Sequence, residues 1–100
     1  MTDRELTPED FTRSIRRSVR ERLMAGKIQG GGDIIALRGF VGLTQQAFAA
    51  ALGISVHTLR NWEQDRRHPE GPALALLRVA ARHPGVLKEN LMGAARRADG

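Results

Sequence analysis

Four side chains within one short stretch suit hydrogen bonding and apolar contact with the edges of nucleic-acid bases. Arg60 can form a forked pair with guanine, and Asn61 can pair with adenine through its amide. His57 can donate to an acceptor, and Val56 can meet a thymine methyl group. The alternative is that they are ordinary solvated residues on a helix surface. The elements that hold them decide between these interpretations.

Two short helical patterns separated by one glycine hold these residues. The first, about 45–52, follows Thr44, whose hydroxyl can cap it, and stops at Gly53, where a left-handed backbone has no steric cost. The second, about 56–63, follows Ser55, a second capping hydroxyl. A helix, a tight turn and a second helix form the arrangement that sets a recognition helix into a DNA major groove.

An apolar pair, Leu59 and Trp62, predicts which face of the second helix is buried. We therefore expect Trp62 in the core rather than as a stacking platform for bases. Glu63, next to it, is expected to orient an arginine or the following loop within the fold.

The same stretch resembles the helix-turn-helix of the Xre/Cro class of lambdoid repressors, over about Ile34 to Leu91. The matching residues are Leu43, Thr44, Gln45, Ala49, Leu52, Gly53, Ser55, Thr58, Leu59, Glu63 and Pro69. The chain departs at Asp65, where the family usually has glycine, and we expect a less tight loop there. A narrower resemblance, carried by residues 58–64 and 72–78, is to the HigA-type antitoxins, which pair with small RelE-fold toxins.

The resemblance implies roles for residues on both motif helices. Base contacts are expected from Val56, His57, Arg60 and Asn61. Contacts with the DNA backbone are expected from Thr44, Gln45, Ser55, Arg66 and Arg67. For Thr44 and Ser55, a cap and nothing more is the alternative, and for Arg66 and Arg67 it is a solvated loop.

The remaining pattern is helical throughout, and the fold class is all-α. We predict a five-helix lambda-repressor-like domain preceded by an N-terminal helical arm. Its other helices are expected at Ile34 to about Val41, capped by Asp33, at Pro72 to about Arg82, and at Val86 to about Ala95. Ile34, Leu37 and Val41 should face inward.

The N-terminal arm should be one helix from Thr7-Pro8 to Gly26. Its apolar stripe consists of Phe11, Ile15, Val19 and Leu23. The stripe can bind a toxin groove, which we favour, or pack on its own domain, or belong to an arm that binds DNA non-specifically. Gly30–Gly32 reads as a flexible break. The predicted division is 1–32 for arm and linker, 33–95 for the helix-turn-helix domain and 96–100 for a frayed tail.

The formal net charge of +5 favours a polyanionic partner. The charge is uneven, however, because residues 33–70 hold four Lys/Arg against four acids, whereas residues 1–32 hold seven against five. DNA affinity must therefore come from local placement of arginines, from helix N-termini and from two copies acting together.

Composition argues against several other functions. There is no cysteine, and the three histidines have no spacing suited to a metal, so we expect no metal, no cofactor and no enzyme. The polar start and the lack of a long apolar run predict a soluble, cytoplasmic protein without a membrane partner.

The sequence thus predicts a DNA-binding antitoxin that represses its own operon and neutralises a RelE/HigB-like toxin. A homodimer would place two recognition helices on a double-stranded DNA operator, with Leu87 and Leu91, expected to be exposed, as the dimer contact. The alternative is a plain Xre-family repressor without a toxin. An interaction adaptor that has lost DNA binding is supported only by the neutral charge of residues 33–70.

Overall fold

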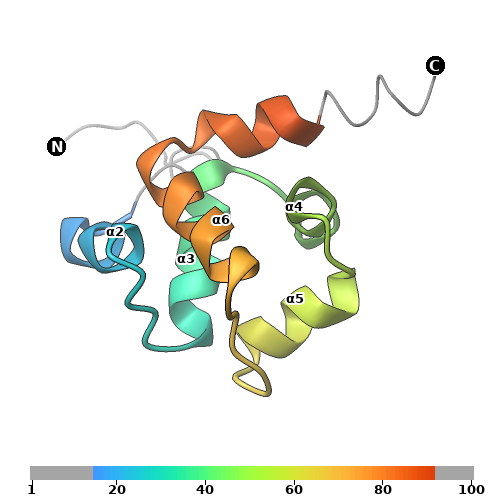
Figure 1. Cartoon of the computed structure of the whole chain (residues 1–100), viewed down its shortest axis with the longest axis horizontal. Coiled ribbons are helices and arrows are strands. Elements are labelled where there is room, and N and C mark those ends of the chain that lie inside the picture. Colours follow the sequence, from blue (N-terminus) through green and yellow to red (C-terminus); the bar gives the residue numbers. More distant parts are fainter. Residues whose placement is uncertain (1–14, 92–100) are drawn as a thin grey trace, which may run out of the picture.

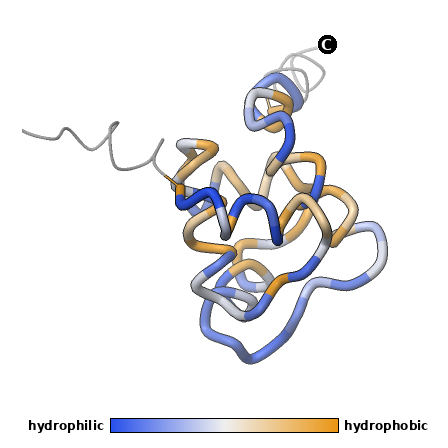
Figure 2. The backbone as a smooth tube through the Cα atoms, turned by 90° about the vertical axis from the view of Figure 1, so that its left-hand side faces the viewer, coloured by the Kyte–Doolittle hydropathy of each residue, from blue (hydrophilic) through white to orange (hydrophobic). Residues whose placement is uncertain are grey.

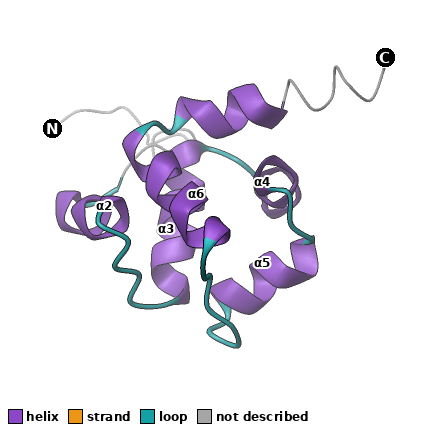
Figure 3. Ribbon diagram, viewed as in Figure 1, coloured by secondary structure: helices purple, strands orange, loops and turns teal. Residues whose placement is uncertain are grey.

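A computed structural model of the chain describes residues 15–91. Its helices are α2 (Arg17–Met24), α3 (Gly31–Val41), α4 (Gln45–Leu52), α5 (Val56–Glu63) and α6 (Pro72–Arg82), followed by helical residues 85–91. Figure 3 shows only helices and loops in this part of the chain. The predicted all-α class is confirmed, and the helices expected from residue 33 onward correspond to α3, α4, α5, α6 and the segment 85–91.

The turn between α4 and α5 has the predicted geometry. The Thr44 hydroxyl accepts a hydrogen bond from the Ala47 N–H at 3.1 Å, which caps α4. Gly53 ends that helix with a φ of 75°, in the left-handed region that glycine adopts without steric cost. The Ser55 hydroxyl accepts from the Thr58 N–H at 3.0 Å and caps α5. The left-handed turn at Gly53 and the Ser55 cap therefore fix the start and direction of the second motif helix.

One hydrophobic core joins all of these helices. Its fully buried large side chains are Phe48, Leu23, Ile34, Leu37, Leu59 and Leu77. Hydrophobic stretches gather toward the middle of the molecule in Figure 2, and hydrophilic stretches run along its lower edge. No single helix among the described residues is long and apolar enough to cross a membrane; α3 and α4 pass that test only as a pair bent by 92°.

Helix α3 begins at Gly31, three residues before the predicted start at Ile34. Asp33 is not the cap of α3, because it lies inside the first turn. Its carboxylate accepts hydrogen bonds from the Gln29 N–H at 2.9 Å and from Arg22 at 2.8 Å. The N–H of Gly31 donates instead to the Asp65 carboxylate at 2.7 Å.

The expected flexible break at Gly30–Gly32 is wrong, because Gly30 is the N-cap of α3 and Gly31 and Gly32 are the first residues of that helix. Gly31 is buried, and a Cβ at this position would lie 2.5 Å from the carbonyl carbon of Glu63 and 2.7 Å from the carbonyl oxygen of Trp62. Real Cβ atoms do not approach backbone this closely. Glycine is therefore required at residue 31 so that α3 can lie against the end of α5.

Helix α2 lies beside α6 and contacts it (Figure 1), and its Leu23, which is 1% exposed, belongs to the hydrophobic core. The helix begins at Arg17, because the backbone of Arg16 is extended. The described part of the arm is thus not one helix through Ile15, as the four-residue stripe predicted. The predicted helix start at Thr7-Pro8 lies outside the described residues, and the division into arm and domain stays a prediction.

Arginines join the ends of α2 and α6 in both directions. The Arg20 side chain donates to the carbonyl of Ala81 at 2.9 Å and lies over the Phe40 ring, 5.0 Å from its centroid. In return, Arg82 donates to the carbonyl of Met24 at 3.4 Å. Cations at helix C-termini are stabilising, because the free carbonyls there carry partial negative charge. These contacts hold α2 against the rest of the fold.

The segment 85–91 folds back on the core, which corrects the expectation that Leu87 is exposed. Leu87 is 2% exposed, and Leu91 is partly buried against the core. The Asn90 amide donates to the carbonyl of Ala51 at 2.7 Å, which ties this segment to the end of α4. Leu87 is therefore buried within its own chain. The exposed large hydrophobic residues among those described are instead Ile35, Leu76, Val79 and Val86.

Candidate nucleic-acid interface

Helix α5 has a buried face and an exposed face, as its apolar pair predicted. Leu59 is 0% and Trp62 6% exposed, so both are core residues. His57 and Arg60 are exposed on the other side of the helix, and Asn61 is half-buried. The polar side chains of α5 that suit base edges are therefore turned away from the core or lie at its margin. Val56, the fourth predicted base contact, is partly buried and packs against the core.

A chain of hydrogen bonds leads from α3 to the exposed face of α5. Arg38 of α3 forms an ion pair with Glu63, with the Arg38 Nε 2.8 Å from a carboxylate oxygen. The same carboxylate accepts a hydrogen bond from the Gln45 amide at 2.8 Å. The amide oxygen of Gln45 then accepts from the Nε of Arg60 at 3.3 Å. The expectation that Glu63 orients an arginine is confirmed, and that arginine is Arg38.

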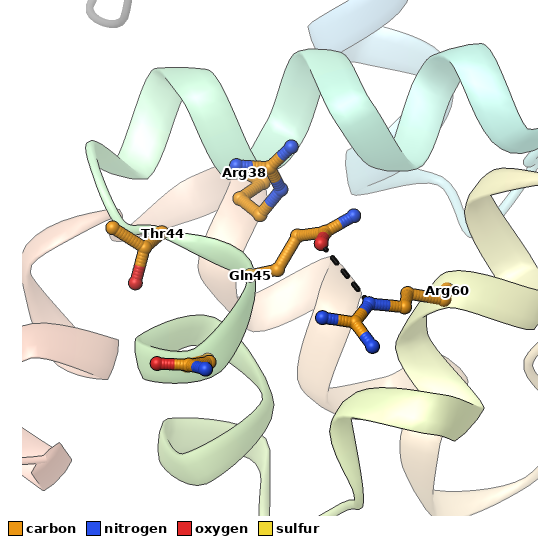
Figure 4. Close-up of a pocket in the computed structure, with 5 residues that line it drawn as sticks. Arg38, Thr44, Gln45 and Arg60 are labelled. Carbon is orange, nitrogen blue, oxygen red and sulfur yellow. Dashed lines mark hydrogen bonds between the residues drawn. The ribbon is translucent and has the colours of Figure 1, made fainter.

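These side chains border a cleft of about 450 Å³ at the start of α4. It is lined by Arg38, Thr44, Gln45, Gln46 and Arg60. Figure 4 shows Gln45 and Arg60 pointing toward each other from α4 and α5. The first backbone N–H groups of a helix have no partner within the helix and attract anions. The start of α4 therefore makes this cleft suited to a phosphate group, beside the exposed guanidinium of Arg60.

A second cleft, of about 350 Å³, lies on the other side of α5. Its lining consists of His57, Thr58, Asn61, Trp62, Arg67 and His68. The backbone N–H groups of Arg66 and Arg67 donate to the carbonyl of Asn61 at 2.9 and 3.3 Å. This fixes the backbone of both arginines at the end of α5, while their side chains are exposed. Arg66 and Arg67 thus flank the predicted reading residues.

The loop after α5 is tight, although a less tight loop was expected from Asp65 in place of glycine. Asp65 has a φ of 61°, in the left-handed region, which aspartate tolerates better than most residues. Its N–H donates to the carbonyl of Trp62 at 3.2 Å, and its carboxylate accepts from Gly31. The expected looser loop is not seen, because Asp65 adopts the left-handed backbone that glycine would adopt and its carboxylate adds a hydrogen bond that glycine lacks.

Sequence patterns did not identify Arg38 as part of this arrangement. It lies 25 residues before Glu63, and no local pattern connects the two. Thr44 and Ser55 are exposed and cap their helices, which leaves both the cap-only and the backbone-contact interpretation open.

The predicted toxin-binding stripe is in contact with this chain's own core. Leu23 is buried, and Ile15 and Val19 are partly buried against the core. Phe11 lies outside the described residues. This placement supports the alternative in which the stripe packs on its own domain.

Comparison with known proteins agrees with the arrangement of α4 and α5. Residues 34–79 match a family model described as helix-turn-helix. The chain is also 40% identical, over 55 residues, to antitoxin HigA-2 of Vibrio cholerae serotype O1. That match covers 55% of this chain and 53% of the Vibrio protein, so it spans about half of that relative. No solved structure matches the chain significantly. The resemblance of this region to the Xre class and to HigA-type antitoxins is confirmed.

Proposed function

We propose that the chain binds double-stranded DNA sequence-specifically through α5 and represses transcription, as the antitoxin of a toxin–antitoxin pair. The observation that carries the DNA-binding part is the seating of α5. Leu59 and Trp62 hold one face of this helix in the core, which leaves His57 and Arg60 exposed on the other. A helix presented in this way can enter a major groove, where side chains distinguish base pairs by their hydrogen-bonding groups.

The surroundings of α5 supply contacts for the DNA backbone. The N-terminus of α4, with Thr44 and Gln45, lies on one side, and the exposed arginines Arg66 and Arg67 follow the helix. Contacts with phosphate fix the position of a protein on DNA, whereas contacts with bases select the sequence. We assign the first task to these residues and the second to Val56, His57, Arg60 and Asn61. Two copies would read half-sites about 34 Å apart.

The antitoxin role is supported by the similarity to HigA-2. The proposed partner is a RelE/HigB-like toxin, bound by this chain in the cytoplasm. The packing of α2 favours a second candidate, a plain Xre-family repressor, because Leu23 is already buried in this chain's own core. A toxin that binds the N-terminal region would therefore have to contact the exposed side of α2 or residues 1–14. Contact with the stripe itself would require α2 to move away from the core.

DNA binding is tested by fluorescence anisotropy with a labelled DNA duplex from upstream of the chain's own gene. A scrambled duplex of equal length and composition gives the non-specific affinity. We expect the wild type to prefer the natural duplex at least tenfold. The double variant Arg60→Ala/Asn61→Ala should lose this preference. A control, Arg17→Ala/Ser18→Ala, removes one charge and one polar group from exposed residues of α2 and should keep it.

The toxin partner is tested by coexpression with the product of the adjacent reading frame. An antitoxin should co-elute with that product and relieve its growth inhibition. If the adjacent product neither inhibits growth nor co-elutes, while the DNA preference is intact, the plain repressor is the correct function.

A further inference from the structure

The side chain of Gln45 lies between a partly buried ion pair and the exposed arginine of α5. Its amide nitrogen donates to Glu63 at 2.8 Å, and its amide oxygen accepts from the Nε of Arg60 at 3.3 Å. Glu63 is held in turn by Arg38, and the Glu63 side chain is only 5% exposed. We propose that Gln45 is a positioning residue that sets the orientation of the Arg60 guanidinium for base reading. The inference rests on the proposed DNA-binding function.

The direction of the Gln45 amide follows from hydrogen-bond chemistry. An ionised carboxylate can only accept hydrogen bonds, so Glu63 must face the NH₂ end of the amide. The oxygen of the amide then faces Arg60, whose guanidinium can only donate. Glu63 thereby determines which way the Gln45 amide is turned. Through Gln45, the buried carboxylate of Glu63 thus orients the exposed guanidinium of Arg60, although the two charged groups do not form an ion pair with each other.

The consequence for Arg60 is a restricted guanidinium. Its Nε–H is directed to Gln45, and its two terminal nitrogens have no hydrogen-bond partner among residues 15–91, so they can donate to an acceptor in the groove. A forked pair with guanine O6 and N7 requires two parallel N–H groups, and these terminal nitrogens supply them. An exposed arginine otherwise loses side-chain freedom on binding, and a group that is already oriented loses less. Gln45 therefore favours one base at the position that Arg60 reads.

A contact of Gln45 with phosphate alone would behave differently. The second amide N–H of Gln45 has no partner among the described residues, so it can still reach the DNA backbone. Loss of a phosphate contact weakens binding to all sequences alike, whereas loss of Arg60 orientation relaxes one operator position. The two roles are separated by measuring discrimination at single positions.

The test compares Gln45→Met, Arg60→Ala and the double variant on duplexes that carry each single base change. Gln45→Met keeps the length of the side chain and removes both hydrogen bonds. We expect it to reduce discrimination about two- to tenfold at the position that Arg60→Ala also relaxes. In the Arg60→Ala background it should change discrimination less than twofold. Gln46→Met is the matched control, because Gln46 is an exposed neighbour that lines the same cleft.

A second readout uses the free protein. The ¹⁵N NMR resonance of the Arg60 Nε–H group is identified by its absence from Arg60→Ala. Its solvent exchange should be slower than that of Arg66 in the wild type and in Gln46→Met, and should equal that of Arg66 in Gln45→Met. Thermal melts of all variants show that the fold is retained.

The failures of the two hypotheses are distinguishable. If the wild type discriminates between sequences and Gln45→Met keeps full discrimination at the Arg60 position, Gln45 does not position Arg60. If the wild type itself shows no discrimination, the proposed function is overturned together with this inference.

Discussion

The carboxylate of Asp65 accepts a hydrogen bond from the backbone N–H of Gly31 at 2.7 Å. This contact joins the loop after α5 to the first turn of α3, across 34 residues of sequence. The same glycine lies against the backbone of Trp62 and Glu63, the last residues of α5. The position of the proposed recognition helix thus depends on a backbone-to-backbone packing contact and one capping carboxylate.

Replacement of Gly31 by alanine should destabilise the fold, because the added methyl group would collide with the carbonyl group of Glu63. Overpacking of this kind costs about 1–3 kcal/mol, and more where the neighbour is backbone. The matched control is Gly32→Ala, where a Cβ meets nothing within 4 Å. That change should stabilise the chain by about 0.4–1 kcal/mol. Urea unfolding of both variants measures the difference, and equal effects would contradict the packing contact.

Asp65 should tolerate asparagine much better than alanine. Asparagine adopts a positive φ and keeps an acceptor for the Gly31 N–H, whereas alanine does neither. We expect Asp65→Ala to cost about 1–3 kcal/mol and Asp65→Asn less than about 1 kcal/mol. Thermal unfolding compares the two variants. Equal stability of the alanine and asparagine variants would show that Asp65 does not cap α3.

Leu23→Ala should destabilise the whole domain if α2 is part of its core. Leu23 is 1% exposed, and removal of a buried leucine side chain costs about 2–5 kcal/mol. Ile35→Ala is the control, since Ile35 is 46% exposed and its loss should cost less than about 1 kcal/mol. Denaturant unfolding followed by Trp62 fluorescence gives both values. An unchanged midpoint for Leu23→Ala would instead identify residues 1–32 as an independent arm.

Arg60 and Arg66 should affect DNA binding in different ways. Loss of Arg60 should cost about 1–3 kcal/mol and relax one operator position, because it removes a contact with a base. Loss of Arg66 should weaken binding to all sequences alike and lower the slope of log K against log salt by about 1. Anisotropy titrations at several salt concentrations distinguish them. Indistinguishable profiles for the two variants would contradict the assigned roles.

Local sequence patterns predicted the elements of the site well. Thr44, Gly53 and Ser55 set the ends of α4 and α5 through hydrogen bonds within three residues or through their own backbone conformation, so their signals are readable in sequence. Leu59 and Trp62 gave the buried face of α5 for the same reason, since residues three apart share a helix face.

Contacts between distant residues were not predictable in this way. The Arg38–Glu63 and Gln45–Glu63 contacts span 25 and 18 residues and depend on how the helices pack. Gly31 looked like part of a flexible break, because the sequence does not show that α5 lies against it. Leu87 was expected to be exposed, because the sequence does not show that residues 85–91 fold back on the core and bury it.

The most direct test of the account is a binding selection from a pool of duplexes with a randomised central segment. The wild type should enrich one sequence motif, and two half-sites about 34 Å apart if two copies bind. Arg60→Ala should enrich the same motif with a single position relaxed. A wild type that retains DNA but enriches no motif would contradict the claim that α5 reads base sequence.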